Sequence, residues 1–282
     1  MRRTALILIV LFLSGLTPAA ATGIHEAPSG SSQESMESLL SFNPEVEVGR
    51  LANGMTYYIR ENAEPKDRAY LRLVVNAGSV LETDEQQGLA HFLEQMAFNG
   101  TEDYPGNQLV RFLESLGMEF GADVNAYTSF DETVYKLTIP TNEEGKLETG
   151  FHVLEQWANA IELTPEEIEK ERGVVLEEWR FGRGAQQRMR DEQFPVLFQG
   201  SKYAERLPIG KREIIRTFER ETLLQFYRDW YRPELMAVIA VGDFDKNRVR
   251  EMIKSRFSSL EREPDAPFRK LYSVPSHEKT LY

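Results

Sequence analysis

The sequence predicts an α+β fold, with an antiparallel sheet and helices packed on one side of it. Segments with alternating or β-branched apolar residues come in pairs, whereas segments with helical periodicity come in runs. This grouping is typical of a sheet built from neighbouring strands and covered by a separate helical layer. The chain has 282 residues and no cysteine, so its core must be stable without disulfides, and the length is sufficient for that.

Six strands and six helices are expected from the alternation of apolar and polar residues. The strands are expected at 45–50, 55–61, 69–77, 119–127, 132–139 and 235–242. The helices are expected at 86–98, 106–116, 145–161, 165–192, 218–230 and 245–257. The fourth helix has the clearest start, because Thr164 is a favourable N-cap and Pro165 suits the first turn.

The N-terminal residues have the features of an export signal. Residues 1–21 contain Arg2 and Arg3, an apolar run from Ala5 to Leu16, and small residues at the end. The apolar run is too short to cross a bilayer, which takes about 20 residues. Residues 22–44 lack apolar periodicity and are expected to be a flexible lead-in. We therefore expect an exported protein, either periplasmic or secreted, with no membrane span.

Charge and the final segment limit the partners and the domain organisation. The formal net charge of −12 argues against nucleic acid or an anionic membrane as a partner. After about residue 257 the periodic pattern ends, and Pro264 and Pro267 are typical of a linker. We expect one folded unit over 45–257, and over 258–282 a linker and the start of a missing following domain, strand-like from Ser276.

A cluster of potential metal-site residues lies on the first expected helix. His91 and residue 95 are four positions apart, so their side chains share one helix face, and Glu94 lies beside them. In the inverted zinc-peptidase motif H-x-x-E-H, two histidines bind the metal and the glutamate activates water. Here the second histidine is replaced by Gln95.

The pentapeptide alone is weak evidence for a metal site. The chain repeats the same pattern from His152 to Gln156, where nothing nearby suggests a site, and we interpret that copy as ordinary helix surface. The surroundings of the first copy distinguish it.

Several ordered segments resemble the insulinase/pitrilysin (M16) family of metallopeptidases, and together they extend over nearly the whole chain after residue 45. The similar segments are Leu51 to Tyr58, Val74 to Ser79 followed by Gly88 to His91, Gly121 to Thr128 with Glu132 to Tyr135, Glu171 to Glu178, and Trp230 to Pro233 with Val238 to Asp243. The resemblance implies the N-terminal unit of such a peptidase, with the motif helix packed against the sheet.

The resemblance also implies a role for individual residues. His91 and Glu178 match metal ligands, Glu94 matches the general base, and Glu171 matches an accessory glutamate two helical turns before Glu178. Glu177 points in another direction and is expected at the surface. The implied cofactor is Zn2+, and the implied partners are a peptide or unfolded polypeptide substrate and a second M16-like half, in cis or in trans.

The implied peptide site lies on an expected strand. Asn125, Ala126 and Thr128 match the edge strand along which the family aligns an extended substrate, main chain against main chain. Ala126 is small where a substrate backbone must approach closely.

Gln95 leaves two functions open. Zinc prefers imidazole, thiolate or carboxylate ligands to a neutral amide, so we expect zinc to be weakly held or absent. In one function the domain is an exported zinc metalloendopeptidase that cleaves extended peptides with metal-activated water, with Gln95 as a degenerate ligand. In the other it is a non-catalytic pseudopeptidase that binds peptides or partners an active M16 subunit.

Overall fold

The fold is described from a computed structural model of the chain, which describes residues 43–182 and 184–279. Contacts divide the chain into Met1–Asn43 and Pro44–Tyr282, and every helix and strand of the described residues belongs to the second unit. The expected signal peptide and most of the expected lead-in lie outside the described residues.

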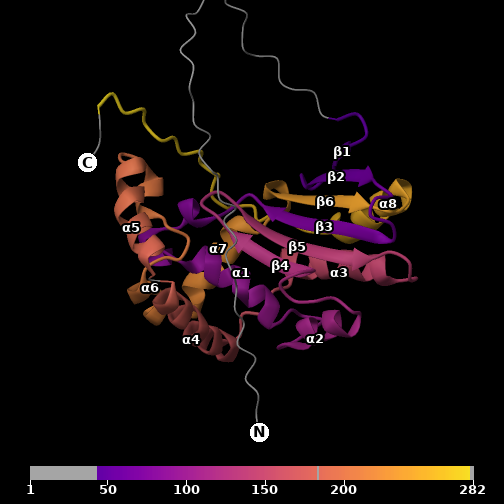
Figure 1. The fold of residues 1–282 in the computed structure, drawn as a ribbon, viewed down its shortest axis with the longest axis horizontal. Helices are drawn as coiled ribbons and strands as arrows, with labels where there is room; N and C mark the ends of the chain where they lie inside the picture. Colours follow the sequence, from indigo (N-terminus) through magenta and orange to yellow (C-terminus); the bar gives the residue numbers. More distant parts are fainter. Residues whose placement is uncertain (1–42, 183, 280–282) are drawn as a thin grey trace, which may run out of the picture. The chain divides into compact units, whose positions relative to one another are not determined.

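A single six-stranded sheet forms the centre of this unit. Its strands are β1 (Glu47–Arg50), β2 (Thr56–Glu61), β3 (Arg68–Val75), β4 (Val124–Thr128), β5 (Thr133–Pro140) and β6 (Met236–Gly242). They follow one another in the order β1-β2-β6-β3-β5-β4, as Figure 1 shows from top to bottom. All six expected strands are present, although the fourth begins at Val124 because residues 119–123 form a turn region.

The sheet is mixed, which corrects the expectation of a purely antiparallel one. β6 pairs in parallel with β2 and antiparallel with β3, with Ile59 opposite Ala240 and Leu71 opposite the same residue. β2 and β3 run in opposite directions, so a strand inserted between them must be parallel to one of the two. The insertion comes from a segment far along the chain, and local sequence patterns do not contain that information.

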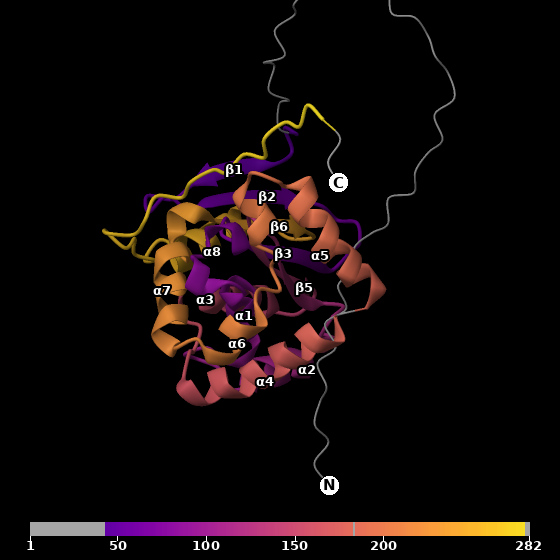
Figure 2. The same ribbon diagram turned by 90° about the vertical axis from the view of Figure 1, so that its left-hand side faces the viewer.

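The helices of the unit include a layer that packs on one face of the sheet. They are α1 (Leu89–Asn99), α2 (Gln108–Ser115), α3 (Lys146–Asn159), α4 (Pro165–Phe181), α5 (Ala185–Leu197), α6 (Arg212–Thr217), α7 (Arg220–Trp230) and α8 (Lys246–Phe257). In Figure 2, α1, α3 and α8 lie along the same side of the strands, and each of them contacts the sheet. The expected α+β class and one-sided helical layer are confirmed.

Burial alternates along the strands as this layering requires. In β3, Leu71 and Leu73 are fully buried against the helices, whereas Tyr70 and Arg72 on the opposite face are only half-buried. The core includes large aromatic side chains such as Trp157. The opposite face of the sheet is therefore available for contacts beyond this core.

The helix expected over 165–192 is in fact two helices. α4 ends at Phe181 and α5 begins at Ala185, with Gly182 and Gly184 at the junction. Glycine is unfavourable inside a helix, so two glycines this close favour a break. The expected start is confirmed, since the Thr164 side chain accepts a hydrogen bond from the backbone of Glu167. α6 was not expected, and it is only six residues long.

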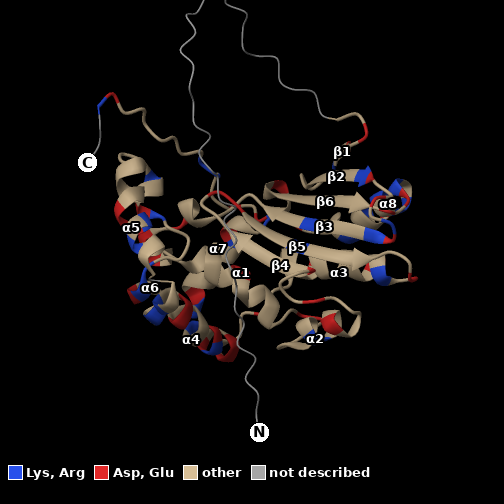
Figure 3. Cartoon of the chain, viewed as in Figure 1, with Lys and Arg blue, Asp and Glu red and all other residues tan. Residues whose placement is uncertain are grey.

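Charged side chains are concentrated on the outer helices, as Figure 3 shows for α4, α5 and α8. Residues 258–279 form no helix or strand, so the strand expected from Ser276 is absent over 276–279. Arg269 in this segment donates to the backbone oxygen of Asn76 at 2.7 Å. Among the described residues, no helix is long and apolar enough to span a membrane.

Candidate metal and peptide site

The helix α1 carries the motif residues, and its N-terminus is held by a carboxyl group from outside the helix. Gly88 precedes the helix with φ of 102°, a conformation that favours glycine, and its missing Cβ would lie 3.1 Å from Gly210 Cα. The buried side chain of Glu82 accepts hydrogen bonds from the backbone of Gly88 and Ala90, at 3.0 and 2.9 Å. Glu82 therefore caps free N–H groups at the start of α1.

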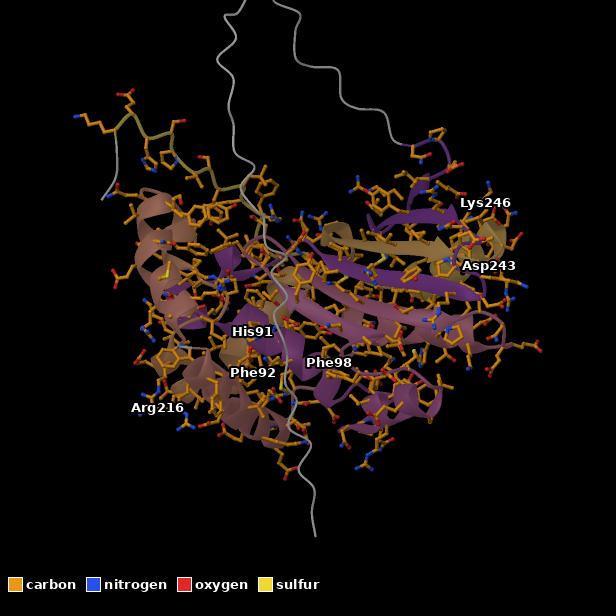
Figure 4. All side chains as sticks on the ribbon, in the orientation of Figure 1. His91, Phe92, Phe98, Arg216, Asp243 and Lys246 are labelled. Atoms are coloured by element: carbon orange, nitrogen blue, oxygen red, sulfur yellow. The ribbon has the colours of Figure 1, made fainter. Side chains whose placement is uncertain are left out.

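His91, Gln95 and Glu178 meet where α1 faces α4. Figure 4 labels His91 on α1, close to the centre of the unit. The amide nitrogen of Gln95 lies 2.9 Å from His91 Nε2 and donates to Glu178 Oε2 at 2.6 Å. His91 and Gln95 are buried, with 9% and 5% of their surface exposed, so these contacts are shielded from water.

The spacing of these atoms tests whether they fit zinc. Two ligands of a tetrahedral zinc ion, each about 2.0–2.2 Å from it, lie about 3.4 Å apart. His91 Nε2 and Glu178 Oε2 are 3.7 Å apart, close to that separation. The third residue, Gln95, points an amide NH2 at both atoms, and such a group donates hydrogen bonds and offers no lone pair to a cation.

The other His, Asp and Glu side chains of the described residues offer no replacement for the missing ligand. In the described part of the chain, no group of three or more His, Cys, Asp or Glu side chains is placed to hold a metal ion. His91 and Glu178 fit the family's metal, whereas Gln95 does not. The residues present therefore do not form a three-ligand zinc site.

The carboxyl of Glu94 faces β4, the strand on which a peptide is expected to bind. The Thr128 hydroxyl donates to Glu94 Oε2 at 2.6 Å, which links the end of β4 to α1. Burial raises the pKa of Glu94, although His91 and the hydrogen bond from Thr128 act in the opposite direction. A raised pKa helps a carboxylate to accept a proton near neutral pH, which is the property required of a general base.

Glu171 lies two helical turns before Glu178 on α4 and has its own amide partner. Asn99 donates to Glu171 Oε2. Burial raises the pKa of Glu171, and the hydrogen bond from Asn99 opposes that effect. Glu177 is exposed and pairs with Arg180, as expected for a residue on another face of the helix.

β4 is an edge strand, with β5 as its one neighbour in the sheet. In an antiparallel pair, every second residue of a strand hydrogen-bonds to its neighbour and the residues between point away from it. The backbone bonds from Ser129 to Glu132 and from Thr138 to Asp123 show that the odd-numbered residues of β4 bond to β5. Residues 125 and 127 therefore bond toward β5, and the main-chain groups of Ala126 and Thr128 point to the free edge. Asn125 Oδ1 accepts from the backbone N–H of Ala126 at 2.8 Å, which satisfies this edge donor.

Sequence reasoning missed two residues of this region and one contact. Asn99 continues the spacing of His91 and Gln95 by four residues, so helical periodicity could have identified it. Glu82 lies before the helix, and local patterns did not indicate that its carboxylate would fold back. The contact of Thr128 with Glu94 depends on the tertiary fold.

The repeated pattern from His152 lies elsewhere. His152 Nε2 is 3.0 Å from Asp103 Oδ2, and Arg256 bonds Glu155. Gln156 is buried and exchanges hydrogen bonds with Asp103. This copy is a polar cluster that joins α3 to a neighbouring loop and to α8.

Comparison with known families identifies the scaffold. The insulinase (peptidase family M16) profile matches residues 57–194, and the M16 inactive-domain profile matches residues 217–282. The chain belongs to peptidase family M16. This M16 chain is 45% identical over 219 residues to a probable zinc protease, PqqL, from Haemophilus influenzae, which covers 78% of the chain and 24% of the relative.

Other M16 relatives support the same assignment. The zinc protease PQQL-like protein of Arabidopsis thaliana is 44% identical over 238 residues, which is 84% of this chain and 25% of that protein. The crystal structure of the first half of the periplasmic protease PqqL from Escherichia coli superposes with a TM-score of 0.79 at 37% identity, covering 83% of this chain and 50% of that one. The chain thus spans about a quarter of the length of these curated M16 relatives.

Proposed function

We propose that this M16 chain is an exported peptide-binding unit that binds an extended polypeptide along β4 and does not hydrolyse it efficiently. The observation that carries the proposal is the Gln95 amide, which donates toward both His91 and Glu178 where the family places a metal. Export is supported by the signal-like residues 1–21 and by the description of the E. coli relative as periplasmic.

The free edge of β4 supports the peptide-binding part. The main-chain groups of Ala126 and Thr128 point away from β5, so an added strand finds donors and acceptors there. The Asn125 side chain accepts a hydrogen bond from one of these donors, the N–H of Ala126. This side chain must rotate away when a peptide binds, and its amide can then form a hydrogen bond with the peptide. The Thr128–Glu94 hydrogen bond joins this edge to the residue that matches the family's general base, which supports the proposal.

A second candidate is residual zinc-dependent peptidase activity. It is favoured by Glu94, which is buried and hydrogen-bonded beside the peptide edge as a general base would be. The relatives are named as zinc proteases, which also favours residual peptidase activity. In this case Gln95 is a degenerate ligand, Zn2+ is held weakly by His91 and Glu178, and Glu171 has an accessory role.

The domain organisation is also a proposal. We propose that residues 45–257 are the folded M16 unit and that residues 258–282 lead to a following domain. The proposed partner is a second M16-like half, in cis or in trans, and the description of the E. coli structure as a first half supports this arrangement.

Binding of a fluorescent unstructured peptide, measured by anisotropy with EDTA and then with zinc, tests the proposal. Ala126→Pro removes a main-chain donor on the free edge of β4 without touching the β5 ladder, so it should weaken binding at least tenfold. Val48→Pro is the matched control, because β1 forms the opposite edge of the sheet. Equal binding by wild type and Ala126→Pro, or rapid cleavage of the peptide by wild type, would contradict the proposal.

A further inference from the structure

The Gln95 side chain lies where its amide nitrogen contacts the two atoms that a metal would join. It is 2.9 Å from His91 Nε2 and 2.6 Å from Glu178 Oε2, while those two atoms are 3.7 Å apart. We propose that the Gln95 amide replaces the metal structurally and holds the histidine and the carboxylate together by hydrogen bonds. The inference rests on the proposed function in one respect, namely that the site works without metal.

The chemistry of the three groups fixes the orientation of the amide. The Glu178 carboxylate only accepts hydrogen bonds, so the side of Gln95 that faces it must be the NH2 group. The second N–H of the same group is directed to His91 Nε2, which must then accept. The ring proton of His91 is consequently on Nδ1, which is buried and has no hydrogen-bond partner among the described residues. The lone pair of Nε2 that would bind a metal is used by the amide.

Because the three side chains are buried or partly buried, replacement of the metal by the Gln95 amide matters for stability. His91 and Gln95 are almost fully buried, and Glu178 is partly shielded, with 23% of its side chain exposed. A carboxylate and an imidazole in such a place need a positive or donating partner, because an unpaired buried polar group is costly. A metal supplies that partner in an intact site, and here the NH2 group of Gln95 supplies it.

A neighbouring contact shows that α1 and α4 use the same pairing twice. Asn99 on α1 donates to Glu171 on α4, as Gln95 donates to Glu178. The packing of the two helices therefore includes two amide-to-carboxylate contacts and no group that requires a cation. Removing zinc should leave this part of the unit folded.

Thermal unfolding of the full chain in EDTA and in excess zinc tests the inference with four proteins: wild type, Gln95→His, Gln95→Glu and Gln95→Leu. Wild type should unfold at the same temperature in both solutions. Gln95→His, with three ligands, should gain about 5–10 °C at zinc a hundredfold above its Kd. Gln95→Glu should unfold earlier than wild type in EDTA, because two carboxylates then face each other, and zinc should reverse that loss.

Gln95→Leu removes both hydrogen bonds, so it should lower the unfolding temperature in EDTA, and zinc should not restore it. The matched control is Gln156→Leu, which removes a buried glutamine of the repeated pattern on α3 and should show no zinc dependence. A wild-type zinc shift as large as that of Gln95→His would make Gln95 a ligand and overturn the inference. Unchanged unfolding of Gln95→Leu in EDTA would also overturn it.

The histidine tautomer gives an independent readout. The chain has four histidines, so long-range 1H–15N spectra of the ring nitrogens can be assigned by substitution. His91 should show the Nδ1–H tautomer with an accepting Nε2, and the Nε2–H tautomer would overturn the inference. Peptide binding at β4 can fail while these results hold, so failure of the inference and failure of the proposed function are distinguishable.

Discussion

Asn99 donates a hydrogen bond of 2.5 Å to the carboxylate of Glu171. Along α1 this contact lies one helical turn after the contact of Gln95 with Glu178. Asn99 follows Gln95 on α1, whereas Glu171 precedes Glu178 on α4, so the two helices pass each other in opposite directions. Both contacts have a neutral amide as donor and a carboxylate as acceptor. The position of α4 beside the site is thus set by directional bonds as well as by apolar packing.

Asn99→Leu should destabilise the protein by about 2–4 kcal/mol, because it leaves the buried carboxylate of Glu171 without its donor. Urea unfolding of wild type, Asn99→Leu, Glu171→Gln and the double variant measures the effect. Glu171→Gln keeps an oxygen that can accept from Asn99 and should cost about 1 kcal/mol or less. Additive effects in the double variant would show that the two residues are not coupled.

Glu94 and Glu178 should separate into different roles once a histidine stands at position 95. In the Gln95→His protein, Glu94→Gln should abolish peptide hydrolysis and leave bound zinc unchanged, because Glu94 handles protons and is hydrogen-bonded to Thr128. Glu178→Gln should release the metal. Zinc content after dialysis and turnover of an unstructured peptide are the measurements, and identical metal content in the two variants would refute the assigned roles.

The sequence predicted most of this unit because its elements have clear local signals. The alternation in β3 and the N-cap at Thr164 are properties of neighbouring residues, and both appear in the structure. The parallel pairing of β2 with β6 was not predictable, since it depends on where a distant segment returns to the sheet. The break between α4 and α5 was not predicted. The helical periodicity continues across residues 182 and 184, and the two glycines there were given too little weight.

The site was predicted as a set of residues, and its contacts were not. Helical spacing indicated that His91 and Gln95 share a face, and the resemblance supplied Glu178. The donor role of Gln95 toward both partners required the packing of α1 against α4. The same holds for Glu82, whose carboxylate reaches α1 through a turn that no periodic pattern describes.

Two helical glycines should respond to alanine in opposite ways. Gly173 lies on the exposed side of α4, and a Cβ there would meet nothing within 4 Å, so Gly173→Ala should stabilise by about 0.5–1 kcal/mol. A Cβ at Gly150 on α3 would lie 2.7 Å from Leu71 Cδ1, so Gly150→Ala should destabilise by about 1–3 kcal/mol. Urea midpoints measure both, and a shift of the same sign would contradict the close packing of α3 on β3.

Glu82 should make the stability of the protein depend on pH. Burial raises the pKa of Glu82 to about 8 from an ordinary value of 4.5, although hydrogen bonds from Ala90 and Gly88 oppose the rise. The folded protein therefore keeps a proton that the unfolded chain releases between these two values. The stability that this bound proton contributes is fully present below pH 4.5. It is lost progressively as the pH rises from there through about 8.

The loss should amount to at most about 5 kcal/mol, since one pKa unit corresponds to about 1.4 kcal/mol. Glu82→Gln cannot titrate, and its NH2 group opposes one backbone donor of α1, so it should be less stable than wild type at pH 5. The two proteins should converge in stability as the pH approaches 8, because only wild type loses the bound proton's contribution. Urea unfolding at several pH values measures this, with the exposed neighbour Glu85→Gln as the control. Parallel pH curves for wild type and Glu82→Gln would show that the carboxyl capping α1 is already ionised in the folded protein at pH 5.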